Sequence, residues 1–324
     1  MGPAQGKNLT EHHLILGASG FVGRHVAVLL VQAGHRVTLA DRVLLDQDFP
    51  PDIASRVSWQ LLELGAADWD ALVADVDVVH FYAWGSLPAT ANANPGGDLS
   101  LNVGALIDML DALHRRGHGR VVFTSSGGTV YGRLQHIPVS EEHPSAPITA
   151  YGAGKASAEI YLGLYRAMHG IDCRIARISN LYGAGQNLAR GLGAVTTFLH
   201  HALTGQRISI WGTGEIVRDY IHISDAAKCL CQLATIPRGE EFVFNVGSGV
   251  GISLNEIVAE LEQRMHCQLD VVRSATRPFD VPISVLDISR ARKLLAWAPM
   301  LSFSDGIGRT LQDLKAEKHF STLD

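Results

Sequence analysis

Tyr151 and Lys155 are the residues of this sequence whose types and spacing point most directly to chemistry. They lie four positions apart, at the start of an amphipathic run that continues to Met168. At that spacing both side chains project from one face of a helix, so an ammonium group can lie beside a phenol. A free tyrosine has a pKa of about 10 and is a poor base at neutral pH, but a neighbouring cation favours its phenolate. The pair could therefore take a proton from a hydroxyl group.

A glycine-rich turn near the start of the chain indicates a second site. The apolar strand Leu14–Leu16 runs into this turn, and the helix Arg24–Gln32 follows it. Three glycines here would allow a tight turn, close approach to a pyrophosphate and close packing, while the helix N-terminus supplies amide donors. This placement between a strand and a helix predicts a dinucleotide-binding loop. The expected contacts are Gly17, Ser19, Gly20, Phe21, Val22 and Gly23.

The next predicted strand ends in a carboxylate that bears on the choice of dinucleotide. Strand Arg36–Ala40 is followed by Asp41, eighteen positions past Gly23. A carboxylate there accepts hydrogen bonds from the ribose hydroxyls and repels a 2′-phosphate, so NAD is favoured over NADP. Arg42 weakens this preference, because an adjacent guanidinium could tolerate the phosphate. We expect both Asp41 and Arg42 to lie at the cofactor.

The two sites together resemble the short-chain dehydrogenase/reductase superfamily, in its Gly-x-x-Gly-x-x-Gly spacing and in Tyr-x-x-x-Lys about 130 residues later. Further segments narrow the resemblance to the extended type, the NAD-dependent sugar-nucleotide epimerase/dehydratase family. In chain order these segments are 124–132 (ending in Val-Tyr-Gly), 177–183, 218–222, 244–249 and 277–280. The resemblance therefore covers nearly the whole chain.

This resemblance implies an activity like that of UDP-glucose/galactose 4-epimerase. NAD-dependent epimerisation at C4 of a UDP-sugar would pass through a transient 4-keto sugar, with Tyr151 and Lys155 as catalytic residues that also contact the cofactor. Asn180, Arg218 and Arg277 would hold the diphosphate of the substrate, for which a guanidinium fork is well suited. Homodimerisation is common in the family and is expected here by analogy.

One departure from the family pattern concerns the catalytic hydroxyl. The position that carries the serine or threonine of the family is occupied here by Gly127. Ser126, Thr129 or a water must then orient the sugar hydroxyl, or the chemistry depends on Tyr151 alone. We favour Thr129, because it aligns with the glutamate that reaches the sugar in the 4,6-dehydratases.

The same alignment bears on rival functions. Gly128 and Thr129 stand where those dehydratases have their acid–base pair, which argues against 4,6-elimination by the usual route. A dehydratase or reductase of the family remains the first alternative. A non-catalytic dinucleotide-binding module is the second, and the intact Tyr151 and Lys155 disfavour it.

The run Phe81–Trp84 follows a predicted strand and is bulkier than is common in the family at that place. Ala83 within it is expected to contact the cofactor. The aromatic residues around Ala83 either line the cofactor or sugar pocket or pack in the core.

The elements that must position these residues alternate between strand and helix up to about residue 175. This pattern predicts an α/β fold, a Rossmann-type doubly wound parallel sheet covered on both faces. Shorter elements follow, including a helix at Leu254–Met265 capped by Ser253 and Glu256. We expect an NAD-binding domain over residues 1–175 and a smaller mixed α/β, mainly sugar-nucleotide-binding lobe over 176–324, from which some segments return to the sheet.

Composition excludes several other classes of protein. The 324 residues are 47% hydrophobic and carry a net charge of −5 without a charged block, so neither nucleic acid nor a membrane surface is expected as a partner. No signal peptide or membrane-spanning run is evident, and the four cysteines are too few for a disulfide framework, which favours the cytoplasm. No metal site is expected, because the histidine pairs lack ligand spacing; solvated side chains are predicted for His12-His13, His200-His201, His114 and His118.

Overall fold

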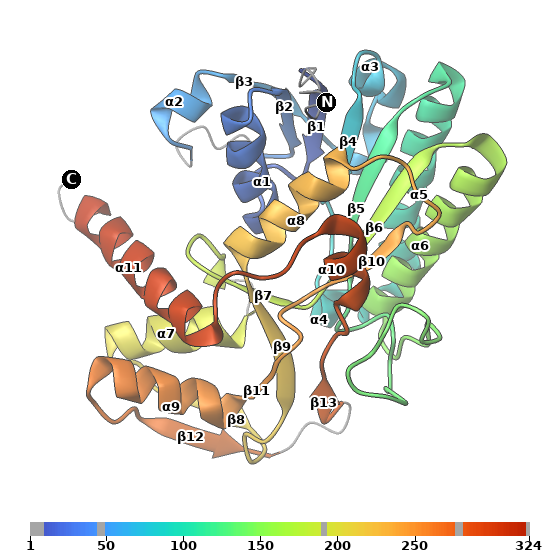
Figure 1. Ribbon diagram of the computed structural model, residues 1–324. Helices are drawn as coiled ribbons and strands as arrows, with labels where there is room; N and C mark the ends of the chain where they lie inside the picture. Colours follow the sequence, from blue (N-terminus) through green and yellow to red (C-terminus); the bar gives the residue numbers. More distant parts are fainter. Residues whose placement is uncertain (1–9, 44–48, 189–192, 276–280, 322–324) are drawn as a thin grey trace, which may run out of the picture.

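A parallel sheet of seven strands forms the centre of the computed structural model, which describes residues 10–43, 49–188, 193–275 and 281–321 (Figure 1). The strands are β1 (His12–Leu16), β2 (Arg36–Asp41), β3 (Val57–Leu61), β4 (Val78–Phe81), β5 (Arg120–Ser126), β6 (Asp172–Ile178) and β10 (Val243–Val246). Their order across the sheet is β10-β6-β5-β4-β1-β2-β3. The chain therefore winds outward in both directions from β1, which confirms the predicted doubly wound α/β fold.

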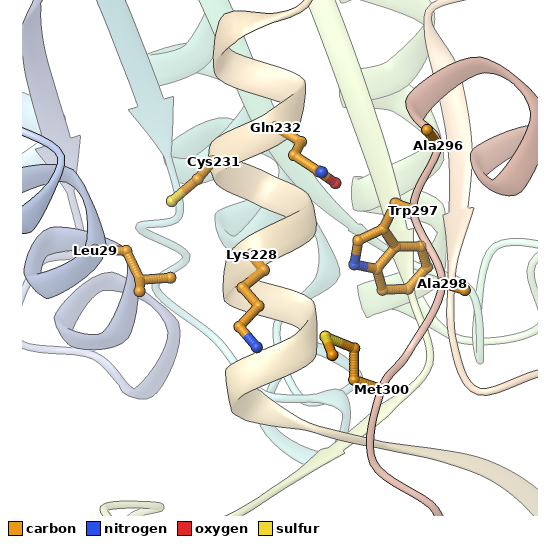
Figure 2. Close-up of a pocket in the computed structure, with 8 residues that line it drawn as sticks. All are labelled: Leu29, Lys228, Cys231, Gln232, Ala296, Trp297, Ala298 and Met300. Carbon is orange, nitrogen blue, oxygen red and sulfur yellow. The ribbon is translucent and has the colours of Figure 1, made fainter.

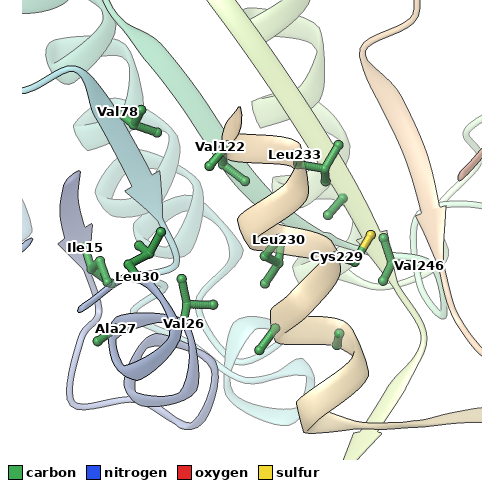
Figure 3. Close-up of a cluster of buried hydrophobic side chains, with 14 of the residues drawn as sticks. Ile15, Val26, Ala27, Leu30, Val78, Val122, Cys229, Leu230, Leu233 and Val246 are labelled. Carbon is green, nitrogen blue, oxygen red and sulfur yellow. The ribbon is translucent and has the colours of Figure 1, made fainter. Parts of the chain in front are cut away.

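Helices cover both faces of this sheet. Helices α1 (Phe21–Gln32) and α8 (Ile223–Thr235) pack on one face, while α3 (Trp69–Val73), α5 (Pro95–Arg116) and α6 (Ala150–His169) lie on the other. Figure 3 shows the first interface, where side chains such as Leu30 and Leu230 meet Val78 and Val122 of the sheet. Because both faces are covered, the inner strands β1, β4, β5 and β6 are mostly buried. Short helices α2 (Pro51–Ala54), η2 (Leu64–Ala66), α4 (Pro88–Ala91) and α10 (Ser289–Leu295) complete this part.

A second lobe contains shorter strands and its own hydrophobic core. Strands β7 (Asn180–Tyr182), β9 (Val217–His222), β11 (Gly251–Ser253) and β13 (Ile283–Ser284) form one sheet, and β8 (Ile208–Trp211) pairs with β12 (Val271–Ser274). Its helices are α7 (Ala194–Thr204), α9 (Leu254–Met265) and α11 (Phe303–Ser321). The predicted cap of α9 is confirmed, because the Ser253 amide donates to Glu256 Oε2 at 2.7 Å and the Glu256 amide to Ser253 Oγ at 3.2 Å. In the described part of the chain, no helix is long and apolar enough to cross a membrane.

The prediction of solvated histidines is wrong for His12 and His13. His13 is 0% exposed and His12 only 7%, because β1 is a central strand with helices over both faces. Each ring has a buried partner instead: His12 Nε2 lies 2.8 Å from Thr38 Oγ1, and His13 Nδ1 lies 2.9 Å from His80 Nε2. Burial and the neighbouring His80 lower the pKa of His13 to about 2, so this ring is neutral.

A buried ion pair fastens α6 to the sheet. Arg177 of β6 donates from Nε to both carboxylate oxygens of Glu159 at 3.1 Å and from Nη2 to Oε2 at 2.6 Å. Ser125 of β5 also donates to this carboxylate. Glu159 stands four positions after Lys155 on α6, so the pair fixes the helix that carries the predicted catalytic residues.

We predict that Glu159→Gln lowers the free energy of unfolding by about 3–5 kcal/mol, because it leaves the buried Arg177 without its counter-charge. Urea unfolding followed by circular dichroism measures this change. The exposed pair of Arg115 and Asp70, with a closest distance of 2.8 Å, is the matched control. Asp70→Asn should cost less than about 1 kcal/mol. Equal losses in the two variants would contradict a structural role for the buried pair.

Candidate active site

The glycine loop is pressed against the end of β4 by contacts that only glycine permits. Gly17 has a φ of +84°, and a Cβ atom there would lie 2.6 Å from the Ala83 nitrogen. A Cβ atom on Gly23 would lie 2.4 Å from the Gly17 carbonyl oxygen. Ala83 and the loop therefore meet between β1 and β4, where the strand order reverses and α/β proteins of this type bind their ligands.

The helix that follows the loop starts without a side-chain cap. Gly20 is the N-cap residue of α1, and no side chain of the described residues accepts a hydrogen bond from the first turn. The backbone amides of the turn that contains Phe21, Val22 and Gly23 can therefore donate hydrogen bonds to a bound anion. The helix dipole also favours an anion at this end of the helix. The loop and the helix start fit the diphosphate of a dinucleotide.

Asp41 is held beside this loop. The Ser19 amide donates to Asp41 Oδ2 at 3.0 Å and the Arg42 amide donates to Oδ1 at 2.8 Å, while the Ser19 hydroxyl donates to the Val43 carbonyl. The carboxylate is therefore fixed at the carboxyl end of β2, and Arg42 is exposed. An anionic group in this position suits a ribose diol and opposes a 2′-phosphate.

Tyr151 and Lys155 lie in the first two turns of α6. Thr149 caps the helix, because its hydroxyl oxygen accepts a hydrogen bond from the Gly152 amide at 3.1 Å. Lys155 is buried, and its Nζ donates to the Thr124 carbonyl at 2.8 Å. The same Nζ lies 5.8 Å from the centre of the Tyr151 ring, so the two side chains share one face of the helix as predicted.

The protein groups alone do not produce a phenolate. Burial and the carboxylate of Asp98 raise the pKa of Tyr151 to about 12, and burial lowers the pKa of Lys155 to about 7 despite the nearby Glu159 and Asp98. The phenol is therefore protonated at neutral pH. We therefore expect Lys155 to favour the phenolate together with a further positive charge, which an oxidised nicotinamide ring would supply.

The turn after β5 places residue 127 against Leu286. A Cβ atom there would lie 2.6 Å from Leu286 Cδ1 and 2.9 Å from Cδ2, so a serine at this position would require the end of the Leu286 side chain to shift. Ser126 ends β5, and Thr129 lies in the turn with a buried Oγ1 that has no hydrogen-bond partner among the described residues. A buried hydroxyl without a partner is costly unless a ligand completes it.

The predicted diphosphate residues lie on paired strands of the second lobe. Asn180 of β7 donates to the Asp219 carbonyl of β9 at 3.0 Å. Arg218, the residue before Asp219, donates to the Val281 carbonyl at 2.6 Å. Asn180 and Arg218 thus lie on neighbouring strands and each donates to a backbone carbonyl, whereas Arg277 lies outside the described residues.

Trp84 is a site residue whose role the sequence left open. Lys155 Nζ lies 3.8 Å from the centre of its ring, and the Tyr151 ring centre is 6.3 Å away. By contrast, the Tyr82 hydroxyl pairs with His80 Nδ1 at 2.7 Å on the opposite face of the sheet. The aromatic run therefore divides between the site and the core. Residues two apart would share a face of a regular strand, so this division shows that the chain leaves strand geometry after β4.

Asp98 and Glu159 were missed by sequence reasoning. Glu159 could have been found, because it follows Lys155 by one helical turn. Asp98 stands in the first turn of α5, where an acidic residue is common for reasons of helix stability alone, so its type gave no signal.

A surface pocket elsewhere contains none of the predicted site residues (Figure 2). It has a volume of about 430 Å³ and lies between α1, α8 and residues 296–300. Lys228 and Trp297 line it from opposite sides. The catalytic assignment therefore depends on the geometry of Tyr151 and Lys155 and not on this pocket.

Comparisons with known proteins agree with this geometry. The model of the NAD dependent epimerase/dehydratase family matches residues 13–247. A UDP-glucose 4-epimerase from Mycolicibacterium smegmatis is 30% identical over 305 residues, which cover 92% of this chain and 97% of that protein. A dTDP-glucose 4,6-dehydratase from Streptomyces antibioticus is also 30% identical, over 92% of this chain and 90% of that protein.

A similar solved structure extends the match to the whole fold. The crystal structure of UDP-glucose 4-epimerase with UDP-glucose from Thermotoga maritima superposes with a TM-score of 0.87 at 26% identity, covering 95% of this chain and 99% of that one. The matched family model includes the glycine loop, Tyr151 and Lys155. The chain therefore belongs to the NAD dependent epimerase/dehydratase family.

Proposed function

We propose that this protein epimerises a UDP-sugar at C4 with NAD as its cofactor. The observation that carries the proposal is the placement of Tyr151 and Lys155 on one face of α6, in a family member whose turn at Gly128 and Thr129 carries no acidic residue. Similarity in sequence alone does not separate an epimerase from a dehydratase, because relatives of both kinds are 30% identical. The missing acid–base pair favours the epimerase.

Tyr151 would act on the sugar as a base, and neighbouring side chains would hold Tyr151 in position. Tyr151, once deprotonated, takes the proton of the C4 hydroxyl, while Lys155 and the Trp84 ring hold the phenol side chain in place. Bound NAD would supply the acceptor for the C4 hydride and the donor for its return to the opposite face of the sugar. The 4-keto sugar turns over in between, and Tyr151 gives the proton back to the C4 oxygen. No net oxidation occurs, so no second substrate is required.

Two groups of residues would bind the cofactor and the substrate. NAD would be held within residues 1–175, and the sugar nucleotide mainly within residues 176–324. The expected cofactor contacts are Gly17, Ser19, Gly20, Phe21, Val22, Gly23, Asp41, Arg42, Ala83, Tyr151 and Lys155. Asn180, Arg218 and Arg277 would hold the diphosphate.

We also propose a cytoplasmic homodimer. Ile160, Leu164 and Met168 are exposed at four-residue intervals on α6, which packs against α5. A second copy of the chain would cover this apolar stripe. A cytoplasmic location is supported by four unpaired cysteines, three of which are largely or partly buried.

The proposed reaction predicts a specific product. Purified protein incubated with a panel of UDP- and dTDP-sugars should convert at least one UDP-sugar to a mixture of C4 epimers, resolved by NMR, without consuming added NADH. Tyr151→Phe is the inactive control. A 4-keto-6-deoxy product would indicate a dehydratase, and stoichiometric use of NADH or NADPH would indicate a reductase.

The position of Asp41 predicts a preference for NAD over NADP. Asp41→Ala should narrow the ratio of the two dissociation constants by about tenfold, because a charge-assisted hydrogen bond and a repulsion are both lost. Isothermal titration with each cofactor measures the ratio, and exposed Asp52→Ala is the control. Equal affinities in the unmodified protein would refute this interpretation of β2.

The buried hydroxyl of Thr129 predicts which residue replaces the missing serine. Thr129→Val should depress turnover by roughly tenfold or more, as expected when a positioned donor is removed, and Ser126→Ala should matter less. Tyr151→Phe should be worse than either, with NAD still bound. Wild-type turnover in Thr129→Val together with collapse in Ser126→Ala would reverse the assignment. Indifference to both would point to an ordered water beside Gly127.

A further inference from the structure

Three potential metal ligands meet at the amino edge of the central sheet. Glu11 precedes β1, His13 lies within it, and His35 precedes β2. One ligand atom from each of these residues lies within 4.8 Å of those of the other two. The glycine loop and α6 dyad lie at the carboxyl ends of the strands, so this group is separate from the proposed active site.

His13 directs an unsatisfied nitrogen into this group. The residue is 0% exposed, and its Nε2 has no hydrogen-bond partner in the part of the chain that the structure describes. The nearest carboxylate oxygen, Glu11 Oε2, is 3.8 Å away, which is beyond hydrogen-bond distance. The His35 ring centre lies 4.5 Å from that of His13. A buried nitrogen with such neighbours indicates a missing ligand.

The other nitrogen of His13 is already oriented by an outer partner. His13 Nδ1 lies 2.9 Å from His80 Nε2, and His80 Nδ1 lies 2.7 Å from the Tyr82 hydroxyl. When Nδ1–H donates to His80, Nε2 carries a lone pair that faces Glu11 and His35. Histidines that bind metals are commonly fixed in this way through their second nitrogen.

We propose that Glu11, His13 and His35 bind a zinc ion. Two imidazoles and one carboxylate form a donor set that zinc accepts, with water in the fourth position, whereas magnesium and calcium require mainly oxygen ligands. The ion would fasten the start of β1 to the connection between α1 and β2. This inference does not depend on the proposed epimerase activity.

Charge and distance set the conditions for binding. Arg120 lies 3.3 Å from Glu11 Oε1, but Asp172 also pairs with Arg120 at 3.1 Å, so Glu11 offers its second oxygen to the ion. Ligand atoms around tetrahedral zinc are roughly 3.4 Å apart. The 4.8 Å limit here therefore requires a small side-chain closure, which the half-buried Glu11 and His35 can make.

The test uses the full chain after treatment with a chelator. Isothermal titration with zinc should give a stoichiometry of one ion per chain. Addition of cobalt in place of zinc should give the visible absorption of a tetrahedral site. His35→Gln and Glu11→Gln should each weaken zinc at least tenfold, while His118→Gln, at an exposed site, should not. These two ligands are half-buried, so their variants should fold, which makes them better tests than His13.

Thermal unfolding gives an independent readout. Zinc at about a hundred times its dissociation constant for the unmodified chain should raise the unfolding midpoint by roughly 4 °C in that chain and in His118→Gln, but by about 2 °C or less in His35→Gln at the same zinc concentration. Absence of stoichiometric zinc binding would overturn the proposal. Zinc binding that His35→Gln and Glu11→Gln leave unchanged would equally overturn it, because the ion would then be held elsewhere.

Discussion

Burial of the Lys155 ammonium group is the constraint on which the rest of the site depends. The group is removed from water at the carboxyl edge of the sheet, so its charge must be compensated by the protein. The Thr124 carbonyl accepts one hydrogen bond, the Trp84 ring lies 3.8 Å away, and Glu159 stands one turn further along α6. These partners act only if α6 is held at a fixed depth against β5. The ion pair of Glu159 with Arg177 provides that fixation.

A hydrogen-bond network extends this fixation to segments distant in sequence. Arg177 lies over the Tyr131 ring at 4.7 Å, and the Tyr131 hydroxyl donates to Asn245 Oδ1 at 2.6 Å. The Asn245 amide side chain in turn donates to the Val139 and Asp287 carbonyls. The return of β10 to the sheet edge thus completes the support of the dyad. The network also explains why the polar Asn245 stands in the otherwise apolar strand β10, because its side-chain amide and its side-chain oxygen both form hydrogen bonds.

The sequence was most informative where local rules decide the structure. Apolar runs with intervening helices predicted the doubly wound sheet, and the four-residue spacing of Tyr151 and Lys155 predicted their common face, because both depend on neighbours in the chain. The burial of His13 was not predictable in this way, since it follows from the central place of β1 in the sheet. The contact of Trp84 with Lys155 likewise depends on how β4 ends relative to α6, which no local pattern encodes.

The contact between Gly127 and Leu286 lies at the position of the missing catalytic hydroxyl. Asp219, buried in the second lobe, accepts hydrogen bonds from the Leu286 amide and from Ser248 and Gly249, so the backbone of Leu286 is held in place. Its side chain packs with Val130 and Tyr131 in one apolar cluster. The second lobe thereby places an apolar side chain where the family pattern has a hydroxyl group. A Cβ atom at residue 127 would require the end of the Leu286 side chain to shift, so the glycine at this position is linked to the packing of the two lobes.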